Sequence, residues 1–209
     1  MRKSYHSVGR YAKAEFEEKR SKFIAAVKPV ETEEQAVAFI NGVRAEHRMA
    51  SHNVYAYTVS CPVGSKRYSD DGEPQGTAGM PVLNVIEKNS LEDIAIVVTR
   101  YFGGTLLGAA GLIRAYGRAA ALGVEEAGIV RYTLCDEVHI MVGYPLFSII
   151  KKEIENSGYT VKDQTYGLDV ELIVQVETGL SDSFIERIAD LTSGAAVTAK
   201  TGLSYNISD

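Results

Sequence analysis

The sequence contains few of the residues from which disulfide scaffolds and metal sites are built. Its 209 residues include two cysteines and four histidines. Cys61 and Cys135 lie far apart and match none of the paired spacings of zinc sites or redox motifs, so no disulfide scaffold is expected. HExxH and GxSxG motifs are also absent, and neither a catalytic residue nor a cofactor is predicted.

Long hydrophobic runs are missing as well. The first twenty residues, MRKSYHSVGRYAKAEFEEKR, lack the apolar stretch of a signal peptide, and nowhere do about 18 uncharged apolar residues follow one another. Secretion and membrane contact are therefore disfavoured, and a reducing, cytoplasmic setting is expected. Apolar residues at 45% and charged residues at 23% are typical of an ordered globular protein.

Charge is divided unevenly along the chain. Residues 1–128 carry 16 Lys and Arg against 15 Asp and Glu, whereas residues 129–209 carry 6 against 12. Because an acidic surface repels phosphate, any nucleic-acid contact is expected in the first part. The same boundary separates two predicted domains, 1–128 and 129–209.

In the first domain, residues 15–30 are predicted to form one strand that ends at Pro29. A helix capped by a Thr32 to Gln35 capping box follows, with Val37, Ile40 and Val43 on its inner face. HNVYAYTVS predicts a strand, SDDGEPQGTAGMP a loop, and DIAIVVTRYF a strand buried on both faces. Residues 106–128 predict a long helix.

The second domain has the order βαββαβ, which is the ferredoxin-like pattern. Its first helix has Pro145 at the first turn and Gly158 at the end, and its second is expected to be capped by Ser181. The third strand alternates strictly, with apolar residues at Val170, Leu172, Val174 and Val176. The predicted fold class is therefore α+β, with an N-terminal α/β domain followed by a ferredoxin-like domain.

The stretch IAIVVTRYFGGTLLGAAGLIRAYGRAA places an arginine and paired glycines between a buried strand and a helix. Helix N-termini offer free N–H groups, and glycine lets a ligand approach the backbone, so an anion site is one interpretation. Arg114 and Arg118 share one helical face and would continue this anion site along the helix as a basic stripe. No Walker or GxGxxG motif is present. The candidate phosphate or RNA contacts are Arg100, Gly103, Gly104, Thr105, Gly108, Arg114 and Arg118.

Close packing is the competing interpretation of the same stretch. Gly108, Gly111, Ala115 and Ala119 form a small-residue face that lets the helix lie close to the sheet without any ligand. The two interpretations are compatible.

The acidic loop RYSDDGEPQGTAGMP is a second candidate. Asp70, Asp71 and Glu73 are weak candidates for a hard-cation site, although the spacing is not that of an EF-hand and solvated or ion-paired carboxylates are the more ordinary explanation. Gly76 and Thr77 would open a short helix whose N-terminus is a second anion site. His52 stands as an isolated histidine with no assignable partner, which favours a structural role.

Two long signatures resemble the IMPACT/YigZ family. They are YSDDGEPQGTAGMPVLN and VVTRYFGGTLLGAAGLIRAY, and RSKFIA and HNVYAY stand where that family has similar segments. The resemblance spans essentially the whole chain. It implies an N-terminal domain similar to domain IV of elongation factor G and to a small-subunit ribosomal protein, followed by a domain similar to domain V.

Three functions are compatible with this resemblance. The first is binding of RNA or a ribosome-associated partner, with modulation of translation; the acidic loop and the RYFGG turn would then meet in one groove whose arginines contact phosphate. The second is a small metal-dependent enzyme for a phosphorylated or nucleotide substrate. The third is an adaptor that binds a translation-associated protein through the acidic C-terminal sheet.

Overall fold

The computed structural model describes residues 2–60 and 64–208, which form two compact units. One unit comprises residues 5–131, and the other comprises residues 2–4 with residues 132–208. Both mix helices and strands, as the sequence predicted. The domain boundaries expected from the sequence, 1–128 and 129–209, remain a proposal. Within the described residues, no helix is long and apolar enough to cross a membrane.

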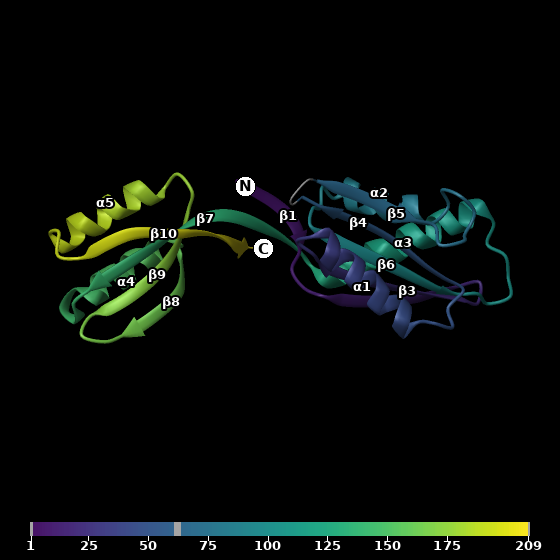
Figure 1. Cartoon of the computed structure of the whole chain (residues 1–209), viewed down its shortest axis with the longest axis horizontal. Helices are drawn as coiled ribbons and strands as arrows, with labels where there is room; N and C mark the ends of the chain where they lie inside the picture. The colour runs from purple at the N-terminus through teal and green to yellow at the C-terminus, as the bar shows by residue number, and fades with distance from the viewer. Residues whose placement is uncertain (1, 61–63, 209) are drawn as a thin grey trace. The chain divides into compact units, whose positions relative to one another are not determined.

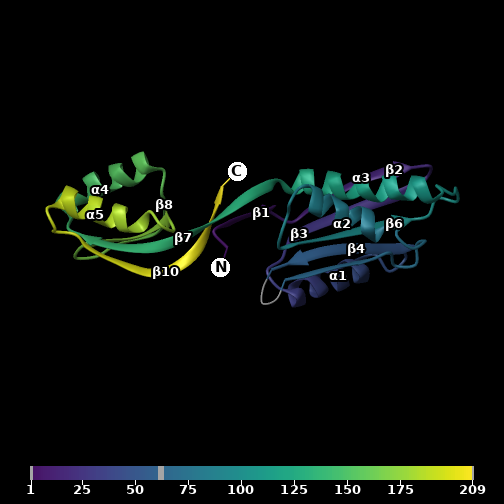
Figure 2. The same cartoon turned by 90° about the horizontal axis from the view of Figure 1, so that it is seen from above.

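The N-terminal unit is a five-stranded sheet with helices on both faces. In sheet order its strands are β2 (Ala12–Glu18), β3 (Ser21–Pro29), β6 (Ile94–Tyr101), β4 (His52–Val59) and β5 (Ser65–Ser69). All neighbouring strands are antiparallel. The helix α1 (Glu33–Glu46) covers one face, and α2 (Gly79–Lys88) with α3 (Ala109–Ala127) covers the other (Figures 1 and 2).

The central strand β6 is buried on both faces, which confirms the sequence prediction. Ile94, Ile96 and Val98 join the core beneath α2 and α3. Ala95 and Val97 point the other way and pack with α1. A continuous apolar run therefore marks a strand that lies between two helical layers.

The predicted first strand is instead a hairpin. β2 and β3 pair from Ala12 opposite Val27 to Glu18 opposite Ser21. Lys19 and Arg20 form the turn, each with a positive φ, of 47° and 66°. The prediction was wrong because the charged residues that it placed on the outer part of one strand are those that turn the chain.

The helix α1 begins where predicted, with one change in its cap. The Gln35 amide N–H donates to Thr32 Oγ1 at 3.3 Å, but the Gln35 side chain accepts from Glu31 N, one residue before the cap. Ala36 is fully buried, whereas Val37 is 43% exposed. The helix therefore turns Ala36, rather than Val37, toward the core that Ile40 and Val43 share.

The helix α3 begins three residues later than predicted and packs closely on the sheet. Ala115 and Ala119 are buried, as the close-packing interpretation expected. The tightest contact between α3 and the sheet is at Gly123, not at Gly108 or Gly111. A Cβ atom on Gly123 would lie 2.7 Å from Val27 Cγ2 and 3.0 Å from Ala25 Cβ. The residue at this position must therefore be glycine for α3 to stay against β3.

The C-terminal unit has the predicted βαββαβ order. Its elements are β7 (Ile129–Val142), α4 (Tyr144–Ser157), β8 (Thr160–Tyr166), β9 (Val170–Glu177), α5 (Ser181–Thr192) and β10 (Val197–Ser208). The strands lie in the order β10, β7, β9, β8, and β1 (Ser4–Val8) also pairs with β7. The alternating residues of β9 are buried with α4 and α5, so the two helices cover one face.

Local signals in the C-terminal unit were mostly read correctly. Pro145 lies in the first turn of α4, and Gly158 ends that helix in the left-handed conformation. Ser181 is a correction, because the cap residue of α5 is Leu180. Ser181 is buried and donates its hydroxyl to the Asp136 carboxylate of β7, so its side chain turns to the sheet rather than to the helix.

Neither cysteine is assigned a reactive role. Cys135 is buried in β7, and burial raises the pKa of its thiol, which keeps it protonated near neutral pH. Cys61 lies outside the described residues.

Two glycines of α3 provide a matched test of the close approach. Gly123→Ala should lower the free energy of unfolding by about 1–3 kcal/mol, because the added methyl overlaps Val27 and Ala25. Gly117→Ala should raise it by about 0.5–1 kcal/mol, because nothing lies near its Cβ position and alanine favours a helix. Urea denaturation of both variants measures the difference, and equal effects would contradict the close-packing interpretation.

Candidate functional site

The two family-like signatures meet at the end of β6. In the sheet, Arg100 lies opposite Phe23 of β3 and His52 of β4. Glu73, from the loop between β5 and α2, reaches this row and accepts a hydrogen bond from Arg100 Nη1 at 2.6 Å. The acidic loop and the RYFGG turn are therefore joined by a direct ion pair.

Arg100 is held as a buried, paired cation. It is 5% exposed, and Nη2 donates to Ser21 Oγ at 3.3 Å. Its guanidinium lies 5.6 Å from the centre of the Phe23 ring and 5.4 Å from that of Phe102. Nε has no hydrogen-bond partner among the described residues. The charge of Arg100 is thus balanced by Glu73 and flanked by aromatic rings, rather than presented to solvent.

Glu73 is also held from the helix side. The Tyr116 hydroxyl of α3 donates to Glu73 Oε1 at 2.8 Å. Burial, and then the neighbouring Glu73 carboxylate, raises the pKa of Tyr116 well above its usual range. Tyr116 therefore stays a neutral donor, and it fixes the same carboxylate oxygen that Arg100 binds.

His52 has a defined orientation beside this pair. Its Nδ1 lies 2.8 Å from the carbonyl oxygen of Asp71. A carbonyl oxygen only accepts, so Nδ1 carries the proton. Nε2 lies 3.8 Å from Glu73 Oε1, and in the neutral ring it bears a lone pair. A histidine that looked isolated in the sequence is therefore positioned by the acidic loop.

These side chains form the polar side of a cavity of about 380 Å³, which we call the signature cavity. Phe102 is 49% exposed and Leu106 is 82% exposed, so the rim of the cavity is apolar and open. Its lining comes from both signatures and from β4: His52, Glu73, Pro74, Arg100, Phe102, Leu106, Leu107, Gly108, Ala109 and Leu112.

Asp70 does not face this cavity but caps α2. Its carboxylate accepts hydrogen bonds from the backbone N–H groups of Gly76 at 2.9 Å, Ala78 at 3.0 Å and Gly79 at 2.8 Å. Thr77 donates its hydroxyl to the carbonyl oxygen of Pro74. The second anion site expected at Gly76 and Thr77 is therefore filled by a carboxylate of the same loop, which corrects that expectation.

Asp71 has a third set of partners. It pairs with Arg44 of α1 at 3.0 Å and accepts from the backbone N–H of Asn53 at 2.6 Å. The three carboxylates that were weak metal candidates thus bind a helix end, a partly exposed arginine and a buried arginine. Over residues 2–60 and 64–208 no group of three metal-ligating side chains converges.

The glycines of the RYFGG segment have separate roles. A Cβ atom on Gly103 would lie 1.9 Å from the Arg20 carbonyl oxygen, so glycine is required for contact with the β2–β3 turn. Gly104 and Gly108 have positive φ angles of 81° and 73°, with open space beside them. Because α3 starts at Ala109 with Gly108 as its cap, Gly103, Gly104 and Thr105 precede the helix rather than forming its N-terminus.

Arg114 and Arg118 do not line the signature cavity, so the groove in which the acidic loop and the RYFGG turn meet lacks these two expected arginines. They line a hollow of about 230 Å³ between α3 and the β2–β3 hairpin. Lys19, which the sequence reasoning missed, lines it too. We call these three cations and their surroundings the basic hollow. The complete lining is Phe16, Glu18, Lys19, Leu107, Gly111, Arg114, Ala115 and Arg118.

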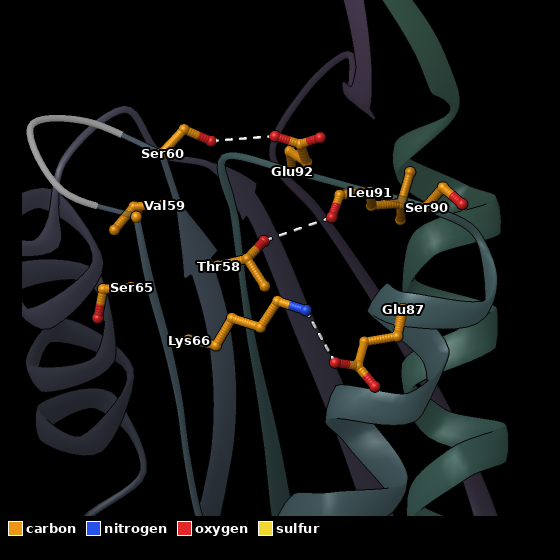
Figure 3. A pocket seen from close by; sticks show the side chains of 10 residues that line it. Thr58, Val59, Ser60, Ser65, Lys66, Glu87, Ser90, Leu91 and Glu92 are labelled. Carbon is orange, nitrogen blue, oxygen red and sulfur yellow. Dashed lines mark hydrogen bonds and ion pairs between the residues drawn. The ribbon is translucent and has the colours of Figure 1, made fainter.

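A larger cavity of about 710 Å³ lies at the other end of β4 (Figure 3). Its polar side chains bind one another across the opening. Lys66 of β5 pairs with Glu87 of α2 at 3.0 Å, and Ser60 donates to Glu92 at 3.1 Å. Thr58 donates to the Leu91 carbonyl oxygen. This cavity includes neither signature, and we assign no site to it.

The protein thus combines an α/β unit that carries two adjoining sites with a ferredoxin-like unit that follows it. Known proteins with this combination can now be compared with it. Residues 19–124 match the family described as the Impact N-terminal domain, and residues 140–195 match a domain of unknown function (DUF1949). The chain belongs to the IMPACT family, as its two signatures predicted.

Relatives cover the chain almost completely. The IMPACT family member YvyE of Bacillus subtilis (strain 168) is 37% identical over 98% of this chain and 94% of its own length. The IMPACT family member YigZ of Escherichia coli (strain K12) is 33% identical over 85% and 88%. A solved structure titled "Crystal structure of an hypothetical protein" is 29% identical, covers 97% of this chain and 99% of its own, and superimposes with a TM-score of 0.62.

The cap on α2 can be tested at Asp70. Asp70→Ala should lower the free energy of unfolding by about 1–2 kcal/mol, because three backbone N–H groups lose their acceptor. Asp70→Asn keeps one acceptor oxygen and should lose less. Chemical denaturation compares the two variants, and an alanine variant as stable as the wild type would rule out the cap.

The buried ion pair should carry more stability than an exposed one. Arg100→Met should lower the free energy of unfolding by about 3–5 kcal/mol, because it leaves the Glu73 carboxylate buried without its cation. Arg44→Met removes a partly exposed pair with Asp71 and should cost about 1 kcal/mol or less.

Adding Glu73→Gln to Arg100→Met should restore part of the loss, because the unpaired charge is then removed. Thermal and urea unfolding measure all three variants. A double variant less stable than Arg100→Met would contradict the assignment of the loss to an uncompensated carboxylate.

Proposed function

We propose that this IMPACT family member acts in the cytoplasm by binding RNA, free or in the ribosome, through the basic hollow, and so modulates translation. The observation that supports this is the convergence of Lys19, Arg114 and Arg118 on one hollow. No carboxylate among the described residues forms an ion pair with any of the three. Unpaired, exposed cations on neighbouring elements suit a phosphate backbone.

Lys19, Arg114 and Arg118 differ from most other cations of the N-terminal unit in having no ion-pair partner among the described residues. Most of those cations have carboxylate partners, which partly cancel their field. The paired side chains are Arg10 with Glu126, Lys13 with Glu46, Lys22 with Glu15, Arg44 with Asp71, Lys66 with Glu87, Arg67 with Glu33 and Arg100 with Glu73. The basic hollow therefore keeps its positive charge available to an external anion.

The basic hollow is also partly ordered in advance. The Arg118 guanidinium lies 4.5 Å from the centre of the Phe16 ring, a cation–π distance that restricts where the side chain points. Glu18 lines the same hollow but forms no ion pair with its cations. A phosphate would thus meet an arginine whose position is already limited, which lowers the entropic cost of binding.

The charge distribution and Arg100 fit this assignment. The C-terminal part carries 12 acidic against 6 basic residues, so phosphate contact is favoured on the N-terminal unit. Arg100, the first arginine of the signature, is paired with Glu73 and is not offered as a phosphate ligand. It positions the acidic loop instead.

RNA binding across a salt series tests the proposal. Arg114→Ala with Arg118→Ala should weaken binding of a short labelled single-stranded RNA at least about tenfold and reduce the slope of log K against log salt by about 1.4. The control is Lys66→Ala with Arg67→Ala, which removes the same charge from β5, where both side chains are paired. Fluorescence anisotropy measures each affinity. Salt-independent binding, or equal losses in the two double variants, would end the proposal.

Modulation of translation needs a separate measurement. Added wild-type protein should change the yield of a reconstituted translation reaction, and the Arg114→Ala, Arg118→Ala variant should lose that effect in proportion to its loss of RNA affinity. An effect that the variant retains in full would place the activity elsewhere on the chain.

A further inference from the structure

We infer that the signature cavity receives a single nucleobase that carries an amino group, from RNA whose phosphates contact the basic hollow. This inference rests on the proposed function and names the part of the RNA that the second site would read. It is supported by the size and walls of the cavity, by the hydrogen-bond acceptors of two residues that line it, and by its position beside the basic hollow.

The dimensions and walls suit a flat ring. A volume of about 380 Å³ lies in the range of small-molecule sites. Phe102 offers an exposed aromatic face, and Leu106, Leu107 and Pro74 supply apolar contact around it. Unpaired bases are commonly held by stacking on such aromatic side chains. The Arg100 guanidinium lies 5.4 Å from the centre of the Phe102 ring, which restricts where this ring points.

The polar side of the cavity holds two side chains with acceptors, Glu73 and His52, beside Arg100, which donates Nη1 to Glu73 and Nη2 to Ser21. Glu73 Oε1 is used by Arg100 and Tyr116, and Oε2 accepts no hydrogen bond from the described residues. His52 donates Nδ1–H to the Asp71 carbonyl oxygen, which leaves Nε2 as the acceptor of the neutral ring. Glu73 and His52 both line the cavity. A ligand group that lies beside Glu73 Oε2 and His52 Nε2 must therefore donate hydrogens.

This requirement separates the bases. Adenine, cytosine and guanine carry an exocyclic amino group that donates two hydrogens, whereas uracil presents mainly carbonyl acceptors. A simple cation is a poorer match, because Arg100 already balances the charge of Glu73. An amino group donates hydrogen bonds without bringing a second positive charge beside Arg100. The geometry therefore favours an amino-bearing base over both uracil and an ammonium ligand.

The cavity and the basic hollow adjoin on α3 and the segment before it. Leu107 lines both, and successive residues of α3 separate them, with Gly111 in the hollow and Leu112 in the cavity. Phosphate and base are likewise neighbouring parts of one nucleotide. A strand whose backbone contacts Lys19, Arg114 and Arg118 would have a base within reach of Phe102.

Binding of nucleosides tests the cavity without the phosphate contact. Adenosine and cytidine should shift the NMR signals of the His52 and Phe102 rings in the full chain, and uridine should shift them at least several-fold less at the same concentration. These probes carry no phosphate, so the result does not depend on the basic hollow. Absence of shifts with all three nucleosides, or equal shifts with uridine, would overturn the inference.

A matched pair of aromatic variants tests the same site with RNA. Phe102→Ala should weaken binding of oligoadenylate about tenfold or more, which is the effect of losing one stacked base, and should abolish the preference over oligouridylate. Tyr11→Ala should change neither, because Tyr11 is equally exposed, at 48%, but packs against Phe39 away from the cavity. Melting temperatures check that both variants are folded.

The outcomes separate this inference from the proposed function. RNA binding that depends on Arg114 and Arg118 but is indifferent to base identity and to Phe102→Ala would overturn the base site and leave the proposed function standing. Nucleoside binding at His52 and Phe102 without affinity for RNA would overturn the proposed function and leave the cavity as a site for a free amino-bearing base rather than for a base of RNA.

Discussion

The buried ion pair between Arg100 and Glu73 is the contact on which the arrangement of the N-terminal unit's signatures depends. It joins the last part of the central strand to a glycine-rich loop that has few apolar side chains of its own. Tyr116 adds a hydrogen bond from α3 to the same carboxylate oxygen, so strand, loop and helix share one acceptor. Arg100 and Glu73 are both removed from water, so each charge needs the other as its partner. A buried charge without its partner is strongly unfavourable. Two residues of this junction, Arg100 and Glu73, also line the signature cavity beside His52.

Local patterns predicted the secondary structure well where one interaction dominates. The apolar run of β6 and the strict alternation of β9 each report burial, and both strands lie where they were expected. The turn at Lys19 and Arg20 was missed, because charged residues are compatible with an exposed strand end as well as with a turn. The cap of α5 was misplaced for a related reason, since Ser181 satisfies its hydroxyl on Asp136, a residue of another element that no local pattern reveals.

The site was harder to predict than the fold because its contacts are long-range. Family-like signatures indicated which residues matter, but the sequence does not say that Asp70 binds backbone N–H groups, Asp71 a partly exposed arginine and Glu73 a buried one. The two interpretations of the RYFGG segment both apply, to different residues. Gly103 is needed for backbone contact with Arg20, whereas Gly104 and Gly108 have free space beside them. Lys19 was missed with the turn that carries it, and Arg114 and Arg118 line a hollow with this residue rather than with the acidic loop.

The carboxylate of Asp70 at the start of α2 has a consequence for selectivity. An N-terminus that is already saturated by an internal anion has no vacancy for a phosphate, and the fixed negative charge beside it repels one. A polyanion that approached this unit would therefore find the start of α2 occupied by the Asp70 carboxylate. The start of α2 is thus closed to external anions by a carboxylate of the same chain, whereas the start of α3 has no side-chain cap.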